Sequence, residues 1–315
     1  MTEGQGRVTL WGIEVFLATA EEGAISAAAR RLGVSPSAVS QQLSSLEAAL
    51  GTTLLERSAR PMTMTPAGTM FRRHAQVILN AEAEARAELA QSDLSGLTTL
   101  RLGMIEDLDA EVTPRLLAEL AGELKGCRFL LETGASHHLL ERLSTRALDI
   151  VVAADAALDV SEGWREVHPL LAEPFLAIAP KGVADFAGLP LIHYTSRHLM
   201  GRQIAAHLAR QNIRIGTRFE LDSYAPILAM VAGGAGWTIL TPLALHQAAR
   251  FRDAVDLRPL PFEPLGRTLS LQARAGVLRD MPAEVAGRLR LLLQAQVVAP
   301  AQAAWPWLGD TLKVL

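Results

Sequence analysis

Short hydrogen-bonding side chains recur at helical spacing early in this 315-residue chain. Residues three or four apart share one face of a helix. The outward positions of one predicted helix would be Ser37, Ser40, Gln41 and Ser44. Hydroxyl and amide groups of this length can reach base edges or phosphates when the helix lies in a DNA major groove. These residue types therefore favour hydrogen-bonded recognition of DNA.

Positive charge follows in a Thr-rich segment that predicts a small β-ribbon. Its Arg57 and Arg60 can bind phosphate or enter a narrow minor groove, which attracts arginine. Between residues 26 and 74 arginines outnumber acidic side chains, although the whole chain has a net charge of −3. A local basic face on a mildly acidic protein suits DNA binding through one module. An ordinary solvated surface is the alternative.

A second set of polar residues follows predicted strands in the C-terminal part of the chain. In open α/β sheets, ligands bind beyond the carboxyl ends of strands, where helix N-termini offer free N–H groups. The candidates at four such ends are Glu106 and Asp107, Ser136 and His137, Tyr194 and Thr195, and Ser223 and Tyr224. The serines and the threonine can each cap a helix and contact a ligand, or cap alone.

Acidic residues crowd the first of these strand ends, at Glu106, Asp107, Asp109 and Glu111. Asp107 or Asp109 can cap the following helix and favour its positive end. Alternatively, a ligand site at these strand ends prefers an amine or another cationic group. The sequence leaves both interpretations open.

Two short helices joined by a glycine turn must position the polar residues between Ser37 and Ser44. Apolar or small residues recur every three to four positions between residues 24 and 50, which is helical spacing. Gly33 ends the first helix, Ser35 caps the second, and Pro36 occupies its first turn, where no backbone N–H is missed. This order is the helix-turn-helix signature. The DNA-binding stretch is expected to begin with Ser35 and Pro36.

A long helical pattern follows over residues 66–92, with no Gly or Pro after Gly68. A helix this polar would not be stable alone. Residues 71, 75, 78, 82, 85 and 89 follow a heptad rhythm, which favours pairing with the same helix of a second chain. Residues 93–98 contain Gly and Ser and predict a hinge.

From residue 99 short β-like runs alternate with helical stretches to about residue 299. Such alternation predicts an α/β fold of mainly parallel sheets with helices on both faces. Its length suggests two lobes around a cleft. The tail, residues 300–315, contains Trp305 and Trp307, and it either packs on a lobe or contacts another subunit.

Composition and cysteine usage place the chain among globular proteins of a reducing compartment. Half of it is hydrophobic, and Cys127 is its one cysteine, which excludes an internal disulfide. Cys127 begins a predicted strand, which favours a buried inert thiol over a redox sensor. The N-terminus lacks a signal peptide, and prolines and glycines break the uncharged run 223–245, so no membrane span is expected. We expect a cytoplasmic protein.

The N-terminal pattern resembles the DNA-binding domain of LysR-type transcriptional regulators. The residues that carry the likeness are Phe16, the Ala27-Ala28-Ala29 run, Leu32, Val39-Ser40, Leu46-Glu47, Leu50-Gly51 and Thr65-Pro66-Ala67-Gly68. The length and strand–helix order of the remaining chain are similar to that family's effector-binding module. One departure is that the family usually has Gln where Pro36 stands, and basic residues near Gln41, Ser44 and Ser45.

The resemblance implies a winged helix-turn-helix over residues 1–65, a dimerisation helix over 66–92, a hinge over 93–98 and a periplasmic-binding-protein-like effector domain over 99–299. The first lobe would hold residues 99–167 and 261–299, and the second residues 168–260. A homodimer or homotetramer would bind double-stranded operator DNA, a small-molecule effector in the cleft, and RNA polymerase. The glycines at 233–236 would join a helix to a strand.

Two other classes of protein fit less well. A solute-binding protein of a transporter would also have two lobes around a cleft, but the chain shows no export signal. An enzyme is least favoured, because no Ser/His/Asp grouping, carboxylate pair or cofactor loop occurs at usable spacing. We therefore expect no cofactor. His137 and His138 are adjacent, so their side chains diverge, and no other histidine has metal-binding spacing, which leaves a metal site without support.

Overall fold

The computed structural model describes residues 7–89, 97–154, 164–186 and 188–315. The chain forms two compact units, of which the first comprises Met1–Gln91 with Thr145–Ala147 and the second Ser92–Ser144 with Leu148–Leu315. Each unit has its own hydrophobic core. None of the helices among the described residues is both long enough and apolar enough to cross a membrane.

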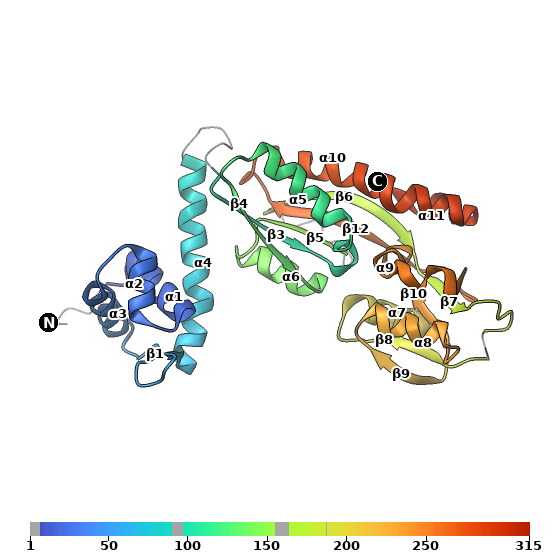
Figure 1. Ribbon diagram of the computed structural model, residues 1–315, viewed down its shortest axis with the longest axis horizontal. Coiled ribbons are helices and arrows are strands. Elements are labelled where there is room, and N and C mark those ends of the chain that lie inside the picture. The colour runs from blue at the N-terminus through green and yellow to red at the C-terminus, as the bar shows by residue number, and fades with distance from the viewer. Residues whose placement is uncertain (1–6, 90–96, 155–163, 187) are drawn as a thin grey trace. The chain divides into compact units, whose positions relative to one another are not determined.

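The N-terminal unit is helical except for one small antiparallel hairpin (Figure 1). The Ser35 hydroxyl caps α3 as expected, accepting a hydrogen bond from the Ala38 N–H at 3.2 Å. Gly33 ends α2 in the left-handed region, at φ +69°, where a side chain would be strained. The elements are α1 (Leu10–Glu22), α2 (Ile25–Leu32), α3 (Pro36–Leu50), β1 (Leu55–Glu56), β2 (Thr63–Met64) and α4 (Pro66–Leu89).

The core of this unit lies between α1, α3 and the start of α4. Phe16, Val39 and Leu43 are fully buried. The ring centroids of Phe16 and Phe71 are 5.4 Å apart, which joins α1 to α4. Burying one side chain of this kind contributes about 1.5–3 kcal/mol. The apolar residues that recur at helical spacing are thus the ones that the helices bury.

Helix α4 divides the predicted heptad seam between two environments. Ala75 is fully buried and Phe71 half-buried in the unit's own core, because α1 packs on that side of the helix. Ile78, in contrast, is 39% exposed. The first two seam positions are therefore used inside the chain. Residues 90–92 of the expected helix and 93–96 of the expected hinge lie outside the described residues.

The first lobe of the C-terminal unit is built on a six-stranded sheet of order β13-β6-β12-β5-β3-β4. Helices α5 and α10 cover one face of the sheet and α6 the other (Figure 1). The strands are β3 (Thr99–Met104), β4 (Arg128–Thr133), β5 (Ile150–Ala154), β6 (Arg165–Pro174), β12 (Gly266–Arg274) and β13 (Lys313–Val314). The helices are α5 (Val112–Glu123), α6 (Ser136–Ser144) and α10 (Met281–Leu293).

The second lobe contains two smaller sheets, of order β10-β7-β11 and β8-β9. Its strands are β7 (Leu176–Pro180), β8 (Leu191–Tyr194), β9 (Thr217–Leu221), β10 (Thr238–Leu240) and β11 (Val255–Arg258). Its helices are α7 (Leu199–Arg210), α8 (Tyr224–Ala232), α9 (Pro242–Gln247) and the 3₁₀ segment η3 (Ala249–Ala254). The glycine turn joins α8 to β10 as expected. A Cβ atom on Gly236 would stand 2.4 Å from the Pro190 carbonyl oxygen, so only glycine fits there.

The expectation of mainly parallel sheets is wrong. Parallel pairing among the described residues joins β3 to β4 and β5, and β8 to β9. Strand β12 is antiparallel to β5 and β6, and β7 is antiparallel to both of its neighbours. The cause is the passage between lobes, because β6 leaves the first lobe and β12 returns to it along the same line in the opposite direction.

The chain was expected to cross from the first lobe to the second near residue 167, but in the structure the crossing comes later. Strand β6 pairs with β12 of the first-lobe sheet as far as Pro174. The sequence of β6, REVHPLLAEP, contains two prolines and three charged side chains, which hid the strand. Edge-like positions tolerate such residues because their N–H groups need not all bond.

The C-terminal tail packs on the first lobe, which is one of the two arrangements expected for it. Helix α10 continues through a π-helical segment, η4 (Gln294–Val298), into α11 (Ala299–Ala304). The chain then turns back through η5 (Pro306–Thr311), and β13 pairs antiparallel with β6. Leu308 and Leu312 are fully buried.

Candidate DNA-binding surface and effector cavity

Helix α3 buries one face and presents a polar one. Ser37, Gln41 and Ser44 are exposed, as predicted, and Ser40 is half-buried beside them. Ser35 and Pro36 are exposed at the start of the helix, where the Ser35 and Ser37 hydroxyls lie 2.9 Å apart. The structure therefore brings all the serines and the glutamine of the prediction to one end and one side of α3.

Arg57 lies against α3. Its Nη2 donates to Glu47 Oε2 at 2.7 Å and to the Ser44 hydroxyl at 3.3 Å. The other Glu47 oxygen accepts from the backbone N–H groups of Leu54, at 2.8 Å, and Leu55, at 3.3 Å. Glu47 thus fixes the entry to the hairpin and the direction of Arg57. The sequence marked Glu47 as part of the family resemblance and as an acidic residue within the basic region, but not for this role.

The predicted basic face is smaller than the count of arginines suggests. Arg31 pairs with Glu21 at 2.6 Å and Arg57 with Glu47, so both charges are balanced locally. The hydrogen bond that Arg31 donates to Glu21 raises the pKa of Arg31 above its usual value. Arg60, in the turn between β1 and β2, is exposed and has no ion pair among the described residues. It is the freer of the two hairpin arginines.

The C-terminal unit has a small cavity at the ends of β3 and β8, between its lobes. Its volume is about 40 Å³. Five of the predicted effector-binding residues line it, namely Glu106, Asp107, Ser136, Tyr194 and Tyr224. Other lining residues, which the sequence did not mark, include Ala154, His198, Met200 and Arg267.

Three predicted effector-binding residues lie outside that lining. His137 is exposed on α6, one position beyond Ser136. Thr195 is buried and donates its hydroxyl to Glu220 Oε1 at 2.7 Å. Ser223 precedes α8 without a side-chain capping bond. Ser136 is different, because its hydroxyl accepts from the Ala154 N–H at 3.0 Å and ties the cavity wall together.

Two of the lining residues, Asp107 and Arg267, belong to a buried cluster of three charges that also includes Glu173. The Arg267 guanidinium contacts Glu173 Oε1 at 2.6 Å and also bonds to Asp107. The side chains of Arg267 and Asp107 are 4% exposed and that of Glu173 is not exposed at all. Glu173 and Arg267 are directly opposite each other on β6 and β12. No sequence motif marked either residue, because only the register of two distant strands pairs them.

Side chains of the second lobe complete this cluster. The Tyr224 hydroxyl donates to Asp107 Oδ1 at 2.7 Å, and Arg267 Nη2 donates to the Thr241 hydroxyl at 3.2 Å. The Tyr194 and Tyr224 rings stack with centroids 5.2 Å apart. Burial, reinforced by the Asp107 charge, raises the pKa of Tyr194 to about 12. Both phenols therefore stay protonated at neutral pH.

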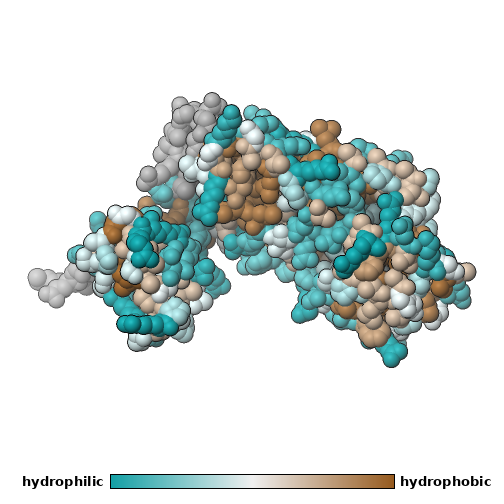
Figure 2. Space-filling model, in the orientation of Figure 1, coloured by the Kyte–Doolittle hydropathy of each residue, from teal (hydrophilic) through white to brown (hydrophobic). Residues whose placement is uncertain are grey.

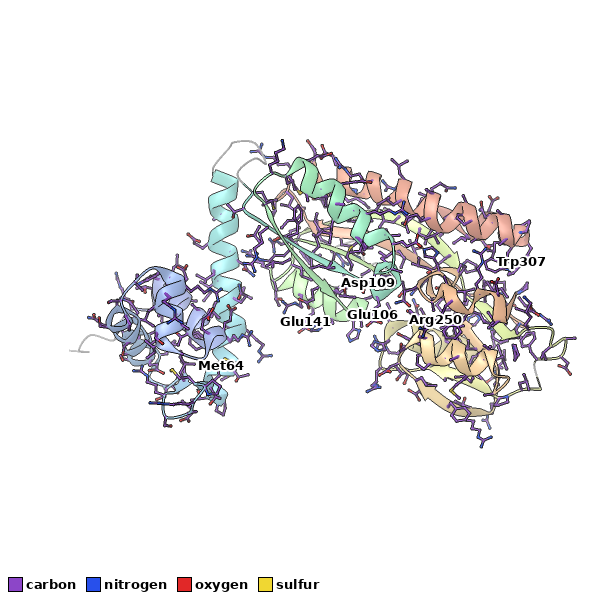
Figure 3. The ribbon with its side chains drawn as sticks, viewed as in Figure 1. Met64, Glu106, Asp109, Glu141, Arg250 and Trp307 are labelled. Carbon is purple, nitrogen blue, oxygen red and sulfur yellow. The ribbon has the colours of Figure 1, made fainter. Side chains whose placement is uncertain are left out.

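The electrostatics of the cavity are acidic. Burial would lower the pKa of Arg267, but Glu173 and Asp107 outweigh it and keep the guanidinium charged. Since that one cation faces two carboxylates, it has no charge to spare for a third. Glu106 stands at the mouth with no hydrogen bond or ion pair among the described residues, and partial burial, then the Asp107 charge, raises its pKa. Figure 3 shows Glu106 and Asp109 at this end of the first lobe.

The capping interpretation of the acidic group does not hold. Helix α5 follows Glu111, which makes no side-chain capping bond. Asp107 instead serves the buried cluster, and Asp109 Oδ1 accepts from the Thr133 hydroxyl at 3.2 Å. Over the described residues, no group of three or more His, Cys, Asp or Glu side chains is arranged to hold a metal ion.

Comparison with known proteins gives two family matches along the chain. Residues 10–69 match the family of bacterial regulatory helix-turn-helix proteins of the lysR type, and residues 95–295 match the LysR substrate binding domain. A probable hydrogen peroxide-inducible genes activator of Mycobacterium avium is 32% identical over 306 residues, 91% of this chain and 95% of that protein. The DNA-binding transcriptional dual regulator OxyR of Escherichia coli K12 is 29% identical, over 84% of this chain and 88% of that protein.

Among solved structures, full-length OxyR from Pseudomonas aeruginosa has a TM-score of 0.67 at 25% identity. The match covers 90% of this chain and 95% of that one. The fold therefore extends over the helix-turn-helix and the two-lobed unit together.

Proposed function

Because the chain belongs to the LysR family of transcriptional regulators, we propose that it binds double-stranded operator DNA through α3 and the β1–β2 hairpin. The observation that carries this proposal is the exposed polar face of α3. Its Gln41 amide can bond to a base edge, and the serine hydroxyls can bond to phosphates or bases. Arg57 and Arg60 extend the surface toward the backbone of the duplex.

Two surfaces support assembly into a dimer or tetramer. On α4, Met70 and Ile78 are 57% and 39% exposed. On β4, at the edge of the six-stranded sheet, Leu130 and Leu131 are 39% and 43% exposed, and Figure 2 shows apolar atoms gathered over this part of the first lobe. Exposed apolar residues on an edge strand favour association with a second chain. A dimer would present two copies of α3 to two half-sites.

We further propose that the cavity between the lobes receives a small-molecule effector. The effector would favour one arrangement of the lobes by its difference in affinity, and so shift the population of DNA-bound assemblies. Because Arg267 is balanced by two acids and Glu106 is unpaired, the cavity suits a neutral or cationic effector better than a carboxylate. RNA polymerase is the expected partner of the DNA-bound assembly, which works in the cytoplasm.

The peroxide response named for the relatives does not carry over through disulfide chemistry. Cys127 is the one cysteine, so no disulfide can form within a chain. It is half-buried rather than buried as expected, and burial raises the pKa of its thiol. Peroxide reacts with thiolates, which this environment disfavours.

Binding of the purified protein to the DNA upstream of its own gene tests the DNA proposal. Fluorescence anisotropy would compare the wild type with Gln41→Ala, Arg57→Ala and, as a matched control, Arg214→Ala on the exposed surface of the second lobe. We expect about tenfold or greater weakening for Gln41→Ala, since a bidentate base contact is worth about 1–3 kcal/mol. Equal binding by all four proteins, or none by the wild type across salt concentrations, would refute the proposal.

Thermal shift of the full chain tests the effector proposal. Amines and their isosteric carboxylates would be compared at equal concentration on the wild type and Glu106→Gln. We expect amines to raise the melting temperature and Glu106→Gln to reduce that gain. Stabilisation by carboxylates alone would overturn the preference while leaving the DNA proposal untouched.

A further inference from the structure

A second groove lies in the C-terminal unit and shares no lining residue with the effector cavity. One wall comes from α9 and η3 of the second lobe, and the other from η4, α11 and Trp305 of the first lobe. Its volume is about 40 Å³, the same as that of the effector cavity. A molecule held here would touch both lobes.

The walls of this groove are mostly apolar. Leu245, Val297 and Ala301 are 2%, 2% and 8% exposed and line it together with the Trp305 indole. The π-helical segment that contributes Val297 interrupts the regular hydrogen bonding of the last helix, and such bulges occur frequently at functional sites. The shape and lining suit the hydrocarbon body of a small molecule.

A cation without an acidic partner stands at the edge of the groove. The Arg252 guanidinium lies over the Trp305 ring, 4.7 Å from its centroid, and no carboxylate pairs with it among the described residues. Arg258, farther along the same face, is different because Asp256 lies 3.6 Å away. Arg252 therefore keeps its full charge and can donate two parallel hydrogen bonds.

A second polar group faces the same space. His246 lines the groove, and its Nε2 is buried without a hydrogen bond. The nearest acid, Glu111, has its Oε2 at 3.9 Å from that nitrogen, beyond hydrogen-bond distance. Burial lowers the pKa of His246, and Arg252 adds to this effect while Glu111 opposes it. A neutral imidazole can supply one N–H to an oxygen in the groove.

We propose that this groove is a second small-molecule site, which takes an apolar monocarboxylate. The hydrocarbon body would pack on Leu245, Val297 and the Trp305 indole, and the carboxylate would accept hydrogen bonds from Arg252 and His246. The adjoining hollow contains Lys181 beside Arg252, together with Arg258 and the two acids Asp253 and Asp256. The preference is opposite in sign to that of the acidic effector cavity.

Isothermal titration of the full chain with cyclohexanecarboxylate tests this site. Its amide and cyclohexylmethylamine serve as neutral and cationic analogues of the same size. We expect millimolar binding of the carboxylate and about tenfold weaker binding of both analogues, because the loss of a charge-assisted hydrogen bond costs about 1.5–3 kcal/mol. Absence of carboxylate binding at millimolar concentration, or equal binding of the amide, would overturn the proposal.

Variants then locate the bound molecule. Arg252→Gln should weaken binding of the carboxylate about tenfold. Arg250→Gln should leave it unchanged, since Arg250 lies over the Phe251 ring and does not line the groove. Glu106→Gln should also have no effect, because a carboxylate bound in the effector cavity would bind more tightly without that acid. Wild-type affinity in Arg252→Gln would place the molecule elsewhere. If Arg252→Gln fails to fold, the comparison of carboxylate with amide on the wild type still decides.

Discussion

The DNA-binding surface and the effector cavity hold their charges in opposite ways. Arg57 and Glu47 meet at 2.7 Å with side chains 36% and 13% exposed, so water and a DNA phosphate can compete for the arginine. Arg267, Asp107 and Glu173 meet with side chains no more than 4% exposed. An exposed pair is worth about 0–1 kcal/mol, but breaking a buried one costs several times more. The first arrangement suits exchange of partners. The second is closed to water, and Tyr224 and Thr241 of the second lobe bond to it.

The largest effect should follow from breaking the buried cluster. Arg267→Met leaves Asp107 and Glu173 as unpaired buried carboxylates and should lower the free energy of unfolding of the C-terminal unit by about 3–5 kcal/mol. Urea unfolding followed by tryptophan fluorescence measures the change. Adding Asp107→Leu and Glu173→Leu to Arg267→Met should restore most of the loss. A loss below about 1 kcal/mol in the single variant would show that the cluster is not closed to water.

The cavity tyrosines should show the next largest effect, at alkaline pH. Burial raises the pKa of Tyr194 to about 12, against about 10 in an unfolded chain. The folded state keeps its proton where the unfolded state has lost it, so this stability is complete below about pH 10 and is lost as the pH rises toward 12. The contribution is about 2–3 kcal/mol.

Absorbance reports this titration without ambiguity, because Tyr194 and Tyr224 are the chain's only tyrosines. Tyrosinate should be nearly absent from the folded protein at about pH 10.5 and should form near pH 10 in urea. Tyr194→Phe should leave one step, that of Tyr224, whose pKa burial also raises well above its usual value. If both phenols of the folded protein titrated near pH 10, water would have access to the cavity.

A smaller effect should follow on the DNA-binding side from Glu47. Glu47→Ala removes the acceptor of the Leu54 and Leu55 N–H groups as well as the partner of Arg57, and should cost the N-terminal unit about 1–3 kcal/mol. Glu47→Gln keeps one carbonyl oxygen for the backbone and should cost less. If Gln matched Ala in thermal unfolding, the charge of Glu47 would matter more than its backbone bonds.

The smallest effect should come from Arg60. Arg60→Gln should weaken DNA binding on all sequences alike and reduce the slope of log affinity against log salt by about 1, as for one lost phosphate contact. Gln41→Ala should change affinity with no change in that slope. An unchanged slope in Arg60→Gln would show that the hairpin turn does not contact the DNA backbone.

The sequence predicted the parts of the molecule that depend on near neighbours. The cap at Ser35, the turn at Gly33 and the outward face through Gln41 follow from spacing within one helix, and the structure has them so. The ends of strands can also be located from near neighbours in the sequence, and Asp107 and Tyr224, marked in this way, line the cavity. Their roles could not be found in this way, because Arg267 bonds to a residue 160 positions away in the chain.

Strand direction was missed for the same reason. Alternating strands and helices favour parallel sheets, but β6 and β12 pass between lobes, and that path is a property of the whole fold. Pro169 also concealed β6 from a search for continuous β-like residues. Cys127 was expected to be buried on strand position alone, and the strand that begins after it, β4, is an exposed edge of the sheet.

Strand β13 covers part of the backbone edge of β6, the strand that links the two lobes. Lys313 and Val314 cover the outer edge of β6, and the Leu315 N–H donates to the Leu170 carbonyl at 3.1 Å. Backbone groups at an uncovered strand edge invite pairing with another chain. The pairing of β13 with β6 therefore also protects the link between the lobes against aggregation.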